Sequence, residues 1–261
     1  MDNTNRFDLM FESLTGLAEE NRANRPVSTP GLPSLKSVLG GAGSIPSGAL
    51  FLGLAEDGLP VLLNLYDPVP GPILLTGDQA SGKTSLLKMI ARAAEYLHVP
   101  SKVQYAVVTS HPAEWMIFQD SKTNAGIYPV QDEATNELLQ SLATWAHNNK
   151  GEEQSILLLI DNLEEIIKLG DQAEQNLRWL LLRGPSRRVW PIITLNADRA
   201  GELKDWLAFF RTRLFGHINE AYIARALTGD SDASLNHLIT GSQFCMREEK
   251  NWLKFRAPAI D

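Results

Sequence analysis

The residues best suited to chemistry form one glycine-rich run, Gly77-Asp78-Gln79-Ala80-Ser81-Gly82-Lys83-Thr84. The apolar run 73–75 precedes it, and an amphipathic helical pattern follows it. This is the strand–loop–helix context in which a G-x-x-x-x-G-K-[ST] loop cradles phosphate groups with its backbone amides. We expect Lys83 to contact the β- and γ-phosphates of a nucleotide and the Thr84 hydroxyl to ligate Mg²⁺. The predicted binding residues extend to Ser85.

Two polar residues that end other predicted strands could complete a nucleotide site. Asp161 follows the apolar run 155–160, and Asn196 follows the run 189–195. In phosphate-loop NTPases an acidic residue at this place holds Mg²⁺. We therefore predict that Asp161 serves as the metal-side acid and Asn196 as a polar sensor of the γ-phosphate. The residue types leave alternatives open, because Asp161 could cap a helix and Asn196 could form a turn.

The elements that must position these residues alternate between strands and helices. Strand patterns lie at 73–75, 103–108, 127–130, 155–160 and 189–195, with helical patterns at 86–97, 138–146 and 172–182. Such alternation predicts an α/β fold, a doubly wound parallel sheet. The interval between Lys83 and Asp161 holds one whole strand, which favours the AAA+, RecA and FtsK/HerA division of NTPases over kinases and GTPases.

The sequence predicts two parts, residues 1–48 and residues 49–261. The first part has a helical pattern at 6–25 and then a Pro- and Gly-rich stretch, which predicts a helical arm with a linker. This arm could dock a partner or pack back on its own domain. The second part is the predicted phosphate-loop domain. We expect two short hairpins in it, one around Asp57-Gly58 and one that pairs 243–246 with 252–255.

Composition limits the function classes. The 261 residues carry a formal net charge of −7, which argues against a protein that simply coats DNA. The single cysteine, Cys245, excludes an internal disulfide framework and a cysteine-rich zinc site, and the histidines show no metal-ligand spacing. No apolar run approaches the length of a membrane span, and the first residues do not resemble a signal peptide. We expect a cytoplasmic protein without a membrane span.

The motifs and their flanks resemble the motor domain of FtsK/HerA-type DNA-translocating ATPases. The resemblance rests on residues 51–65, the phosphate loop, the strand that ends at Asp161, and the stretches 182–196 and 209–218. It covers about residues 49–258 and implies that residues 49–261 are a P-loop ATPase domain. It further implies that the chain binds ATP and Mg²⁺, forms a hexameric ring with ATP between subunits, and passes double-stranded DNA through the pore.

The resemblance also implies a role for arginine. Arg187 or Arg188 would be the finger that contacts the γ-phosphate of the adjoining subunit, with Arg211 and Arg213 as weaker candidates. Each of these side chains could equally be a solvated surface arginine.

The chain departs from the family at the residue after Asp161. The family places a glutamate there as the base that polarises water, whereas this chain has Asn162, which cannot accept a proton. Glu164 and Glu165 lie within a turn of it and are candidates for the base. They could also be carboxylates that favour a helix start.

Two functions from different classes follow from these patterns. The first is an oligomeric ATPase that couples hydrolysis to DNA translocation, which the extended resemblance favours. The second is a nucleotide-gated, weakly hydrolysing subunit of a larger protein assembly, which Asn162 and the net acidity favour. A small-molecule kinase is a third reading, but the chain lacks a lid or acceptor-site signature.

Overall fold

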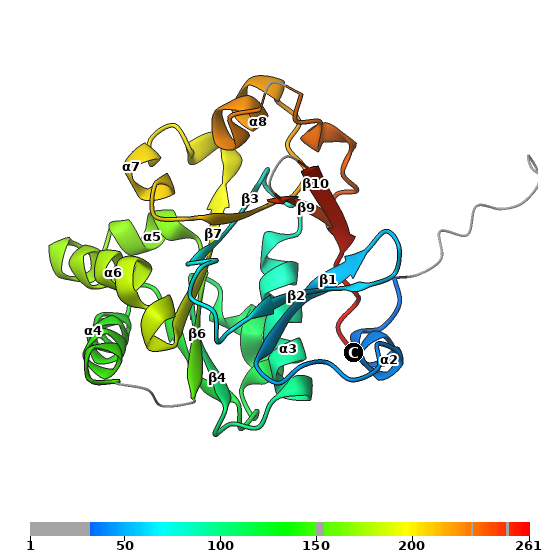
Figure 1. Cartoon of the computed structure of the whole chain (residues 1–261). Helices are drawn as coiled ribbons and strands as arrows, with labels where there is room; N and C mark the ends of the chain where they lie inside the picture. The colour runs from blue at the N-terminus through cyan, green and yellow to red at the C-terminus, as the bar shows by residue number, and fades with distance from the viewer. Residues whose placement is uncertain (1–31, 150–153, 231, 249–250) are drawn as a thin grey trace, which may run out of the picture. The chain divides into compact units, whose positions relative to one another are not determined.

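A computed structural model describes residues 32–149, 154–230, 232–248 and 251–261. Within these residues, ten strands form one mixed sheet in the order β2-β1-β10-β9-β8-β3-β7-β6-β4-β5 (Figure 1). The strands are β1 (Ala49–Ala55), β2 (Pro60–Asn64), β3 (Ile73–Gly77), β4 (Val103–Thr109), β5 (Asn124–Pro129), β6 (Ser155–Asp161), β7 (Val189–Asn196), β8 (Thr212–Phe215), β9 (Gln243–Glu248) and β10 (Asn251–Arg256). The predicted α/β fold is confirmed, and the sheet, which we expect to be parallel, is mostly parallel and mixed, because the hairpins add antiparallel strands.

The six strands from β8 to β5 run parallel and carry the phosphate loop. β3 lies between β8 and β7, and β6 lies between β7 and β4. Ligand sites in such sheets form beyond the carboxyl ends of the strands. The residues that follow β3, β7, β6 and β4 therefore meet at one edge.

Helices cover both faces of these strands. The α-helices are α2 (Leu35–Gly41), α3 (Lys83–Leu97), α4 (Glu133–Asn148), α5 (Leu163–Ile167), α6 (Asp171–Arg183), α7 (Lys204–Leu207) and α8 (Ala221–Thr228). Short 3₁₀ helices are η1 (Pro112–Phe118), η2 (Pro185–Arg187), η3 (Ala197–Arg199) and η4 (Leu235–His237). None of the described helices has both the length and the apolar character that crossing a bilayer requires.

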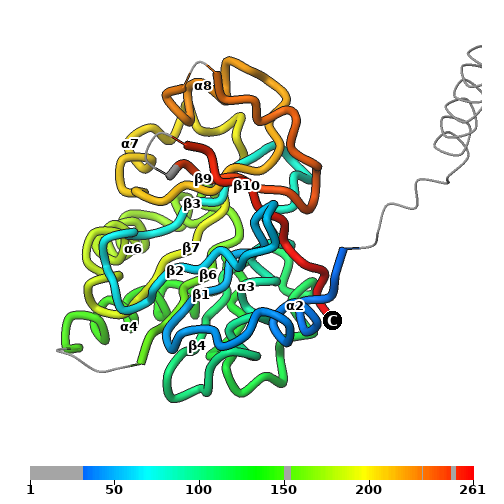
Figure 2. The backbone as a smooth tube through the Cα atoms, turned by 45° about the vertical axis from the view of Figure 1, so that its right-hand side comes forward, coloured from blue at the N-terminus to red at the C-terminus, as the bar shows by residue number. Residues whose placement is uncertain are grey.

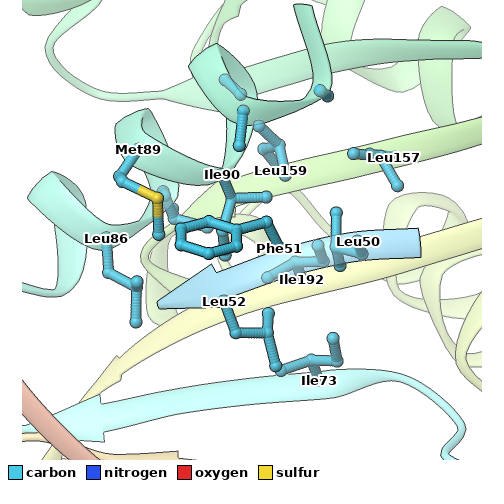
Figure 3. Packing of buried hydrophobic residues seen from close by; sticks show 14 of the residues in the cluster. Leu50, Phe51, Leu52, Ile73, Leu86, Met89, Ile90, Leu157, Leu159 and Ile192 are labelled. Carbon is cyan, nitrogen blue, oxygen red and sulfur yellow. The ribbon is translucent and has the colours of Figure 1, made fainter. Parts of the chain in front are cut away.

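Alternating strand residues divide the core into two clusters. On β3, Leu75 belongs to the cluster that contains α3, and Leu74 belongs to the cluster that contains α4 and α6. On the α3 side, Phe51 of β1 packs beside Met89 and Ile90 (Figure 3). Because β6 is buried on both faces, its sequence is an almost continuous run of leucine and isoleucine.

Both predicted hairpins are present, and both extend the main sheet. β1 pairs antiparallel with β2 around the Asp57-Gly58 turn, and β9 pairs antiparallel with β10. The two hairpins also join each other, with Leu54 opposite Arg256, and β9 joins β8, with Leu214 opposite Met246. The antiparallel half of the sheet is thus built from the two ends of the domain.

Residues 33–48, which the sequence pattern places in the arm, pack with the rest of the domain. The contacts divide the chain into residues 1–32 and the compact unit 33–261. The Leu35 side chain is fully buried, and its N–H donates to the Ala259 carbonyl oxygen at 2.8 Å. Figure 2 shows the C-terminus beside α2. The helix expected at 6–25 lies outside the described residues, so the arm and its docking role stay predictions.

Candidate nucleotide-binding site

The candidate site lies at the carboxyl edge of β3, β7, β6 and β4. Gly77 is level with Asn196 across β3 and β7, and Thr109 is level with Asp161 across β4 and β6. A cavity of about 380 Å³ opens at this edge, within the usual size range of small-molecule sites. Its lining residues are Gln79, Ala80, Gly82, Lys83, Thr84, Ser85, Ser110, His111, Asp161, Asn162, Thr194, Asn196 and Gly241.

The ammonium group of Lys83 is held inside the phosphate loop. Its Nζ donates to the carbonyl oxygens of Gly77 at 3.0 Å and Asp78 at 2.7 Å, and lies 3.5 Å from Ser81 Oγ. Burial lowers the pKa of Lys83 to about 8, although the nearby carboxylate of Asp161 opposes this shift. In a nucleotide complex, negatively charged phosphate oxygens would replace these two neutral carbonyl oxygens as acceptors from Lys83 and would balance the charge of its ammonium group.

The phosphate loop is attached to the C-terminal part of the domain. The Asp78 N–H donates to the His217 carbonyl oxygen at 2.9 Å, and the Asn219 N–H donates to Asp78 Oδ2 at 2.8 Å. Gly82, with φ +98°, has the Gly241 backbone so close that a Cβ would lie 2.7 Å from it. Only glycine fits here, for two reasons. Residues with a side chain rarely adopt this positive φ, and a Cβ would clash with the Gly241 backbone.

Three elements bring oxygen atoms together beside Lys83. The Thr84 hydroxyl, on the first turn of α3, is 3.0 Å from both carboxylate oxygens of Asp161. Thr194 of β7 donates to Asp161 Oδ1 at 3.1 Å. Burial raises the pKa of Asp161, and these two hydrogen bonds oppose that rise. A hydroxyl beside a carboxylate matches the oxygen ligands that Mg²⁺ prefers, so Thr84 and Asp161 fit the metal.

Asn162 has an unusual backbone conformation directly after Asp161. Its φ is 95°, a region that non-glycine residues rarely adopt and that costs free energy. Its N–H donates to Thr194 Oγ1 at 2.7 Å, and its side-chain oxygen accepts the Glu164 N–H at 3.0 Å, capping α5. The Asn162 side chain therefore serves as the cap of this helix.

Each of the two candidate bases on α5 has one carboxylate oxygen in an ion pair, and Glu164 Oε1 is buried without a hydrogen-bond partner within the described structure. Glu164 Oε2 accepts from Arg199 Nε at 3.0 Å, and Glu165 Oε1 pairs with Lys168 at 2.7 Å. Neither glutamate is among the described residues that line the cavity. The cavity is therefore lined by Asp161, Asn196 and six of the predicted phosphate-loop residues, namely Gln79, Ala80, Gly82, Lys83, Thr84 and Ser85. Gly77, Asp78, Ser81 and the two glutamates are not among its described lining residues.

Comparison with known proteins supports the fold. No family model matches the chain, and no curated protein matches its sequence. Many solved structures match the chain. Among them are the cytoplasmic domain of the Thermomonospora curvata type VII secretion ATPase EccC (TM-score 0.65, 16% identity, 88% of this chain), ATPases 2 and 3 of EssC from Geobacillus thermodenitrificans (0.68, 14%, 91%), and the pCW3 conjugation coupling protein TcpA with ATPγS (0.69, 15%, 88%).

The chain has the fold of FtsK/HerA-type ATPases. The structural side of the predicted resemblance is thereby confirmed. The chain spans 28% of the EccC chain, 48% of the EssC chain and 70% of the TcpA chain, so it corresponds to one portion of the first two.

In this ATPase fold, Asn196 lines the cavity from the end of β7, the strand between the phosphate loop and Asp161. That place suits a sensor, and the role itself stays a prediction. Arg187 and Arg188 instead precede β7, at its opposite end. An eight-residue strand is roughly 23 Å long, so neither arginine reaches the phosphate loop of its own chain.

The arginines of the finger prediction have partners within the chain. Arg188 donates to the Leu65 carbonyl oxygen at 3.0 Å and stacks on the Tyr66 ring at 4.5 Å, and Arg187 donates to the Asn149 carbonyl oxygen at 3.1 Å. A finger role would need an adjoining subunit and would break these contacts.

Arg213 and Arg211 differ in their surroundings. Arg213 donates to the carbonyl oxygens of Leu207, Phe210 and Leu227 at 2.7–3.3 Å, and burial lowers its pKa. This network holds α7 and α8 beside β8. Arg211 is exposed. Arg213 therefore has a structural role, whereas the exposed Arg211 is the one of the two that a neighbouring subunit could contact.

Sequence reasoning missed four residues that line the cavity: Thr194, Ser110, His111 and Gly241. Thr194 carried a usable signal, because it is a polar residue in an apolar strand, two positions before Asn196, and so points to the same face. The other three follow or precede strands whose order in the sheet the sequence did not define.

Proposed function

We propose that this chain binds ATP with Mg²⁺ and hydrolyses it. The observation that carries the proposal is the convergence of Lys83, Thr84 and Asp161 on one cavity. A lysine within a glycine-rich loop at the start of a helix suits phosphate, and adjacent hydroxyl and carboxylate oxygens suit Mg²⁺. When bound, Mg²⁺ offsets the negative charge on the phosphate oxygens.

The chain's own residues have separate tasks in this proposal. Lys83 exchanges the carbonyl oxygens of Gly77 and Asp78 for phosphate oxygens, while the loop amides from Gln79 to Thr84, followed by Ser85, surround the phosphates. Thr84 and Asp161 hold the metal. Asn196 orients the attacking water or contacts the γ-phosphate, because it ends the strand that lies between the loop and Asp161.

We further propose that the ATPase is a cytoplasmic motor, a homo-oligomer of hexameric type that translocates double-stranded DNA. The support is the shared fold, since EccC is a secretion ATPase and TcpA a conjugation coupling protein. None of the described residues that line the cavity is an arginine. In a ring, Arg187 or Arg188 of a neighbouring subunit would take this place beside the nucleotide. The part of the predicted arm that lies outside the compact unit, residues 1–32, is proposed to bind protein partners.

Steady-state ATP turnover, measured with and without double-stranded DNA, tests the proposal. We expect the parent chain to turn over ATP, faster with DNA, and Lys83→Ala to lose nucleotide binding or turnover. Lys122→Ala is the matched control, because Lys122 is an exposed lysine outside the cavity. Unchanged affinity and rate in Lys83→Ala would refute the site. If the parent chain turned over ATP at the same rate with and without DNA, the proposal of a DNA motor would be refuted and that of an ATPase would still hold.

A second candidate function is a nucleotide-gated subunit that binds ATP and hydrolyses it weakly. Asn162 favours it, because this residue stands where the family has its base and serves instead as a helix cap. The distinguishing measurement is size-exclusion chromatography with a non-hydrolysable ATP analogue. Assembly that changes with the analogue, together with bound ATP that stays intact, would select this function over the motor.

A further inference from the structure

The proposed hydrolysis needs a group that takes a proton from the attacking water, and the segment after Asp161 does not place one in the cavity. Asn162 lines the cavity but cannot accept a proton. Glu164 and Glu165 are not among its described lining residues, and each has one carboxylate oxygen in an ion pair. Within the described chain, the remaining candidates are the lining side chains that come from other elements.

Three of the described lining residues have side chains that exchange a proton in the ordinary pH range, namely Lys83, Asp161 and His111. In the proposed function Lys83 binds phosphate and Asp161 holds Mg²⁺, so neither is free to act on the water. Imidazole is also the side-chain group that serves most often as a general base. Of the described lining residues, His111 is therefore the one whose side chain is left for this role.

The order of the strands brings His111 to Asp161, although the two residues are far apart in the sequence. β4 and β6 run parallel, and the last residue of β4, Thr109, is level with Asp161. β4 and β7 are the two neighbours of β6. His111, which follows β4, and Thr194, which lies on β7, therefore line the cavity from opposite sides of the strand that carries Asp161.

The backbone of His111 is fixed, whereas its imidazole has no internal partner. The His111 N–H donates to Thr109 Oγ1 at 3.0 Å, and its carbonyl oxygen accepts the Glu114 N–H at 3.0 Å. Trp115, fully buried, anchors the turn that follows. Among the described residues, no hydrogen bond or ion pair involves the ring nitrogens of His111, which is exposed. The ring can thus accept a proton without first breaking a contact, unlike the paired oxygens of the α5 glutamates.

We infer that His111 is the general base of the proposed hydrolysis, supplied by the segment after β4 in place of the glutamate that position 162 lacks. The inference rests on the proposed ATPase function. The neutral imidazole accepts a proton from the water on its unprotonated nitrogen while the water oxygen forms a bond to the γ-phosphorus. The bond between the γ-phosphorus and the bridging oxygen breaks, and ADP keeps its electron pair. The imidazolium then releases the proton to solvent, which leaves ADP, phosphate and one proton.

The test replaces His111 with side chains that separate proton acceptance from charge. His111→Gln keeps a polar side chain and His111→Arg keeps a positive charge, but neither can accept a proton near neutral pH. We expect turnover to fall about 100-fold or more in both variants, the usual contribution of a general base, with MgATP affinity retained. His147→Gln is the matched control, because His147 is an exposed histidine near the end of α4 and outside the described cavity lining. Its turnover should equal that of the parent.

Chemical rescue supplies a readout that a structural role would not move. His111→Ala removes the ring from an exposed position, so free imidazole can take its place beside the water. Added imidazole should raise the turnover of His111→Ala by about tenfold or more, because it restores a proton acceptor. It should leave the parent and Lys83→Ala unchanged, since the first has its base and the second lacks the lysine that binds phosphate.

Three results would overturn the inference. Parent-like turnover in His111→Gln would show that no proton passes to this residue. Parent-like turnover in His111→Arg would assign to position 111 a cation that contacts phosphate. A loss in His111→Ala that imidazole does not repair would assign the residue a structural role. In each case the parent still turns over ATP, so the proposed ATPase would hold. A parent chain that binds ATP without turnover would instead refute the proposed hydrolysis, and the inference with it.

Discussion

Replacing Thr194 with valine removes one hydroxyl that joins β7 to β6 at the site. The substitution keeps the β-branched shape of a side chain that is 2% exposed. Two hydrogen bonds disappear, the donation to Asp161 Oδ1 at 3.1 Å and the acceptance from the Asn162 N–H at 2.7 Å. In the variant, the Asn162 N–H therefore has no acceptor, and Asp161 Oδ1 accepts one hydrogen bond fewer.

The expected cost follows from these two losses. A hydrogen bond to a charged group contributes about 1.5–3 kcal/mol, and an unpaired buried donor costs about 1–3 kcal/mol. Because Thr84 still donates to Asp161 and Asn162 is only partly buried, we expect the lower part of each range. The free energy of unfolding should fall by about 2–4 kcal/mol, and Tm by roughly 5–15 °C for a domain of this size.

The cost should also depend on pH. The lost bond favoured the ionised form of Asp161, so its removal raises the pKa of Asp161 in the folded chain still further. Above that pKa the variant carries the full deficit. As the pH falls through it, Asp161 becomes protonated in both proteins, and the difference in stability shrinks.

Thr76→Val is the matched control, and urea unfolding of both variants is the assay. Thr76 lies in β3, is buried like Thr194, and its Oγ1 has no hydrogen-bond partner within the described structure. Its replacement should be neutral or stabilise the fold by up to about 1 kcal/mol, because no bond is lost. Thr194→Ser should recover most of the loss. Equal effects of the two valine variants would refute the assigned role of the Thr194 hydroxyl.

Burial of charged and reactive groups predicts three further outcomes. Nucleotide affinity should fall as the pH rises through about 8, because burial lowers the pKa of Lys83 to about 8 and a neutral amine attracts phosphate weakly. Calorimetric titrations well below and well above that pH would measure the affinity, and equal affinities would contradict this prediction. Burial raises the pKa of Cys245 to about 12, so a thiol reagent should label it only on unfolding, and fast labelling of the native chain would contradict its burial. Arg213→Met should lower the free energy of unfolding by about 2–4 kcal/mol, because three carbonyl groups lose a charged donor. Arg211→Met should change it by less than about 0.5 kcal/mol, and equal costs in urea unfolding would contradict this contrast.

The predicted parts of the fold and site are those that depend on local patterns. The glycine spacing and the lysine define the phosphate loop within one short stretch, and an apolar run that stops at Asp161 marks the end of a buried strand. The two hairpins also have local signals. Their pairing with each other, Leu54 opposite Arg256, could not be predicted, because nothing in either strand specifies a partner at the other end of the chain.

The order of the strands in the sheet determines which residues lie beside Asp161, and the sequence does not reveal this order. Glu164 is close to Asp161 along the chain, yet α5 turns its carboxylate to Arg199, a residue that follows β7. Ser110 and His111 are far from Asp161 along the chain, yet they line the same cavity, because β4 pairs with β6 and the two strands end level. Thr194 contacts Asp161 for the same reason, since β7 is the other neighbour of β6. At the edge of a parallel sheet, the residues that contact an acid at the end of a strand therefore come from the neighbouring strands. Residues close to Asp161 in the sequence, such as Glu164, are for this reason poor guides to its contacts.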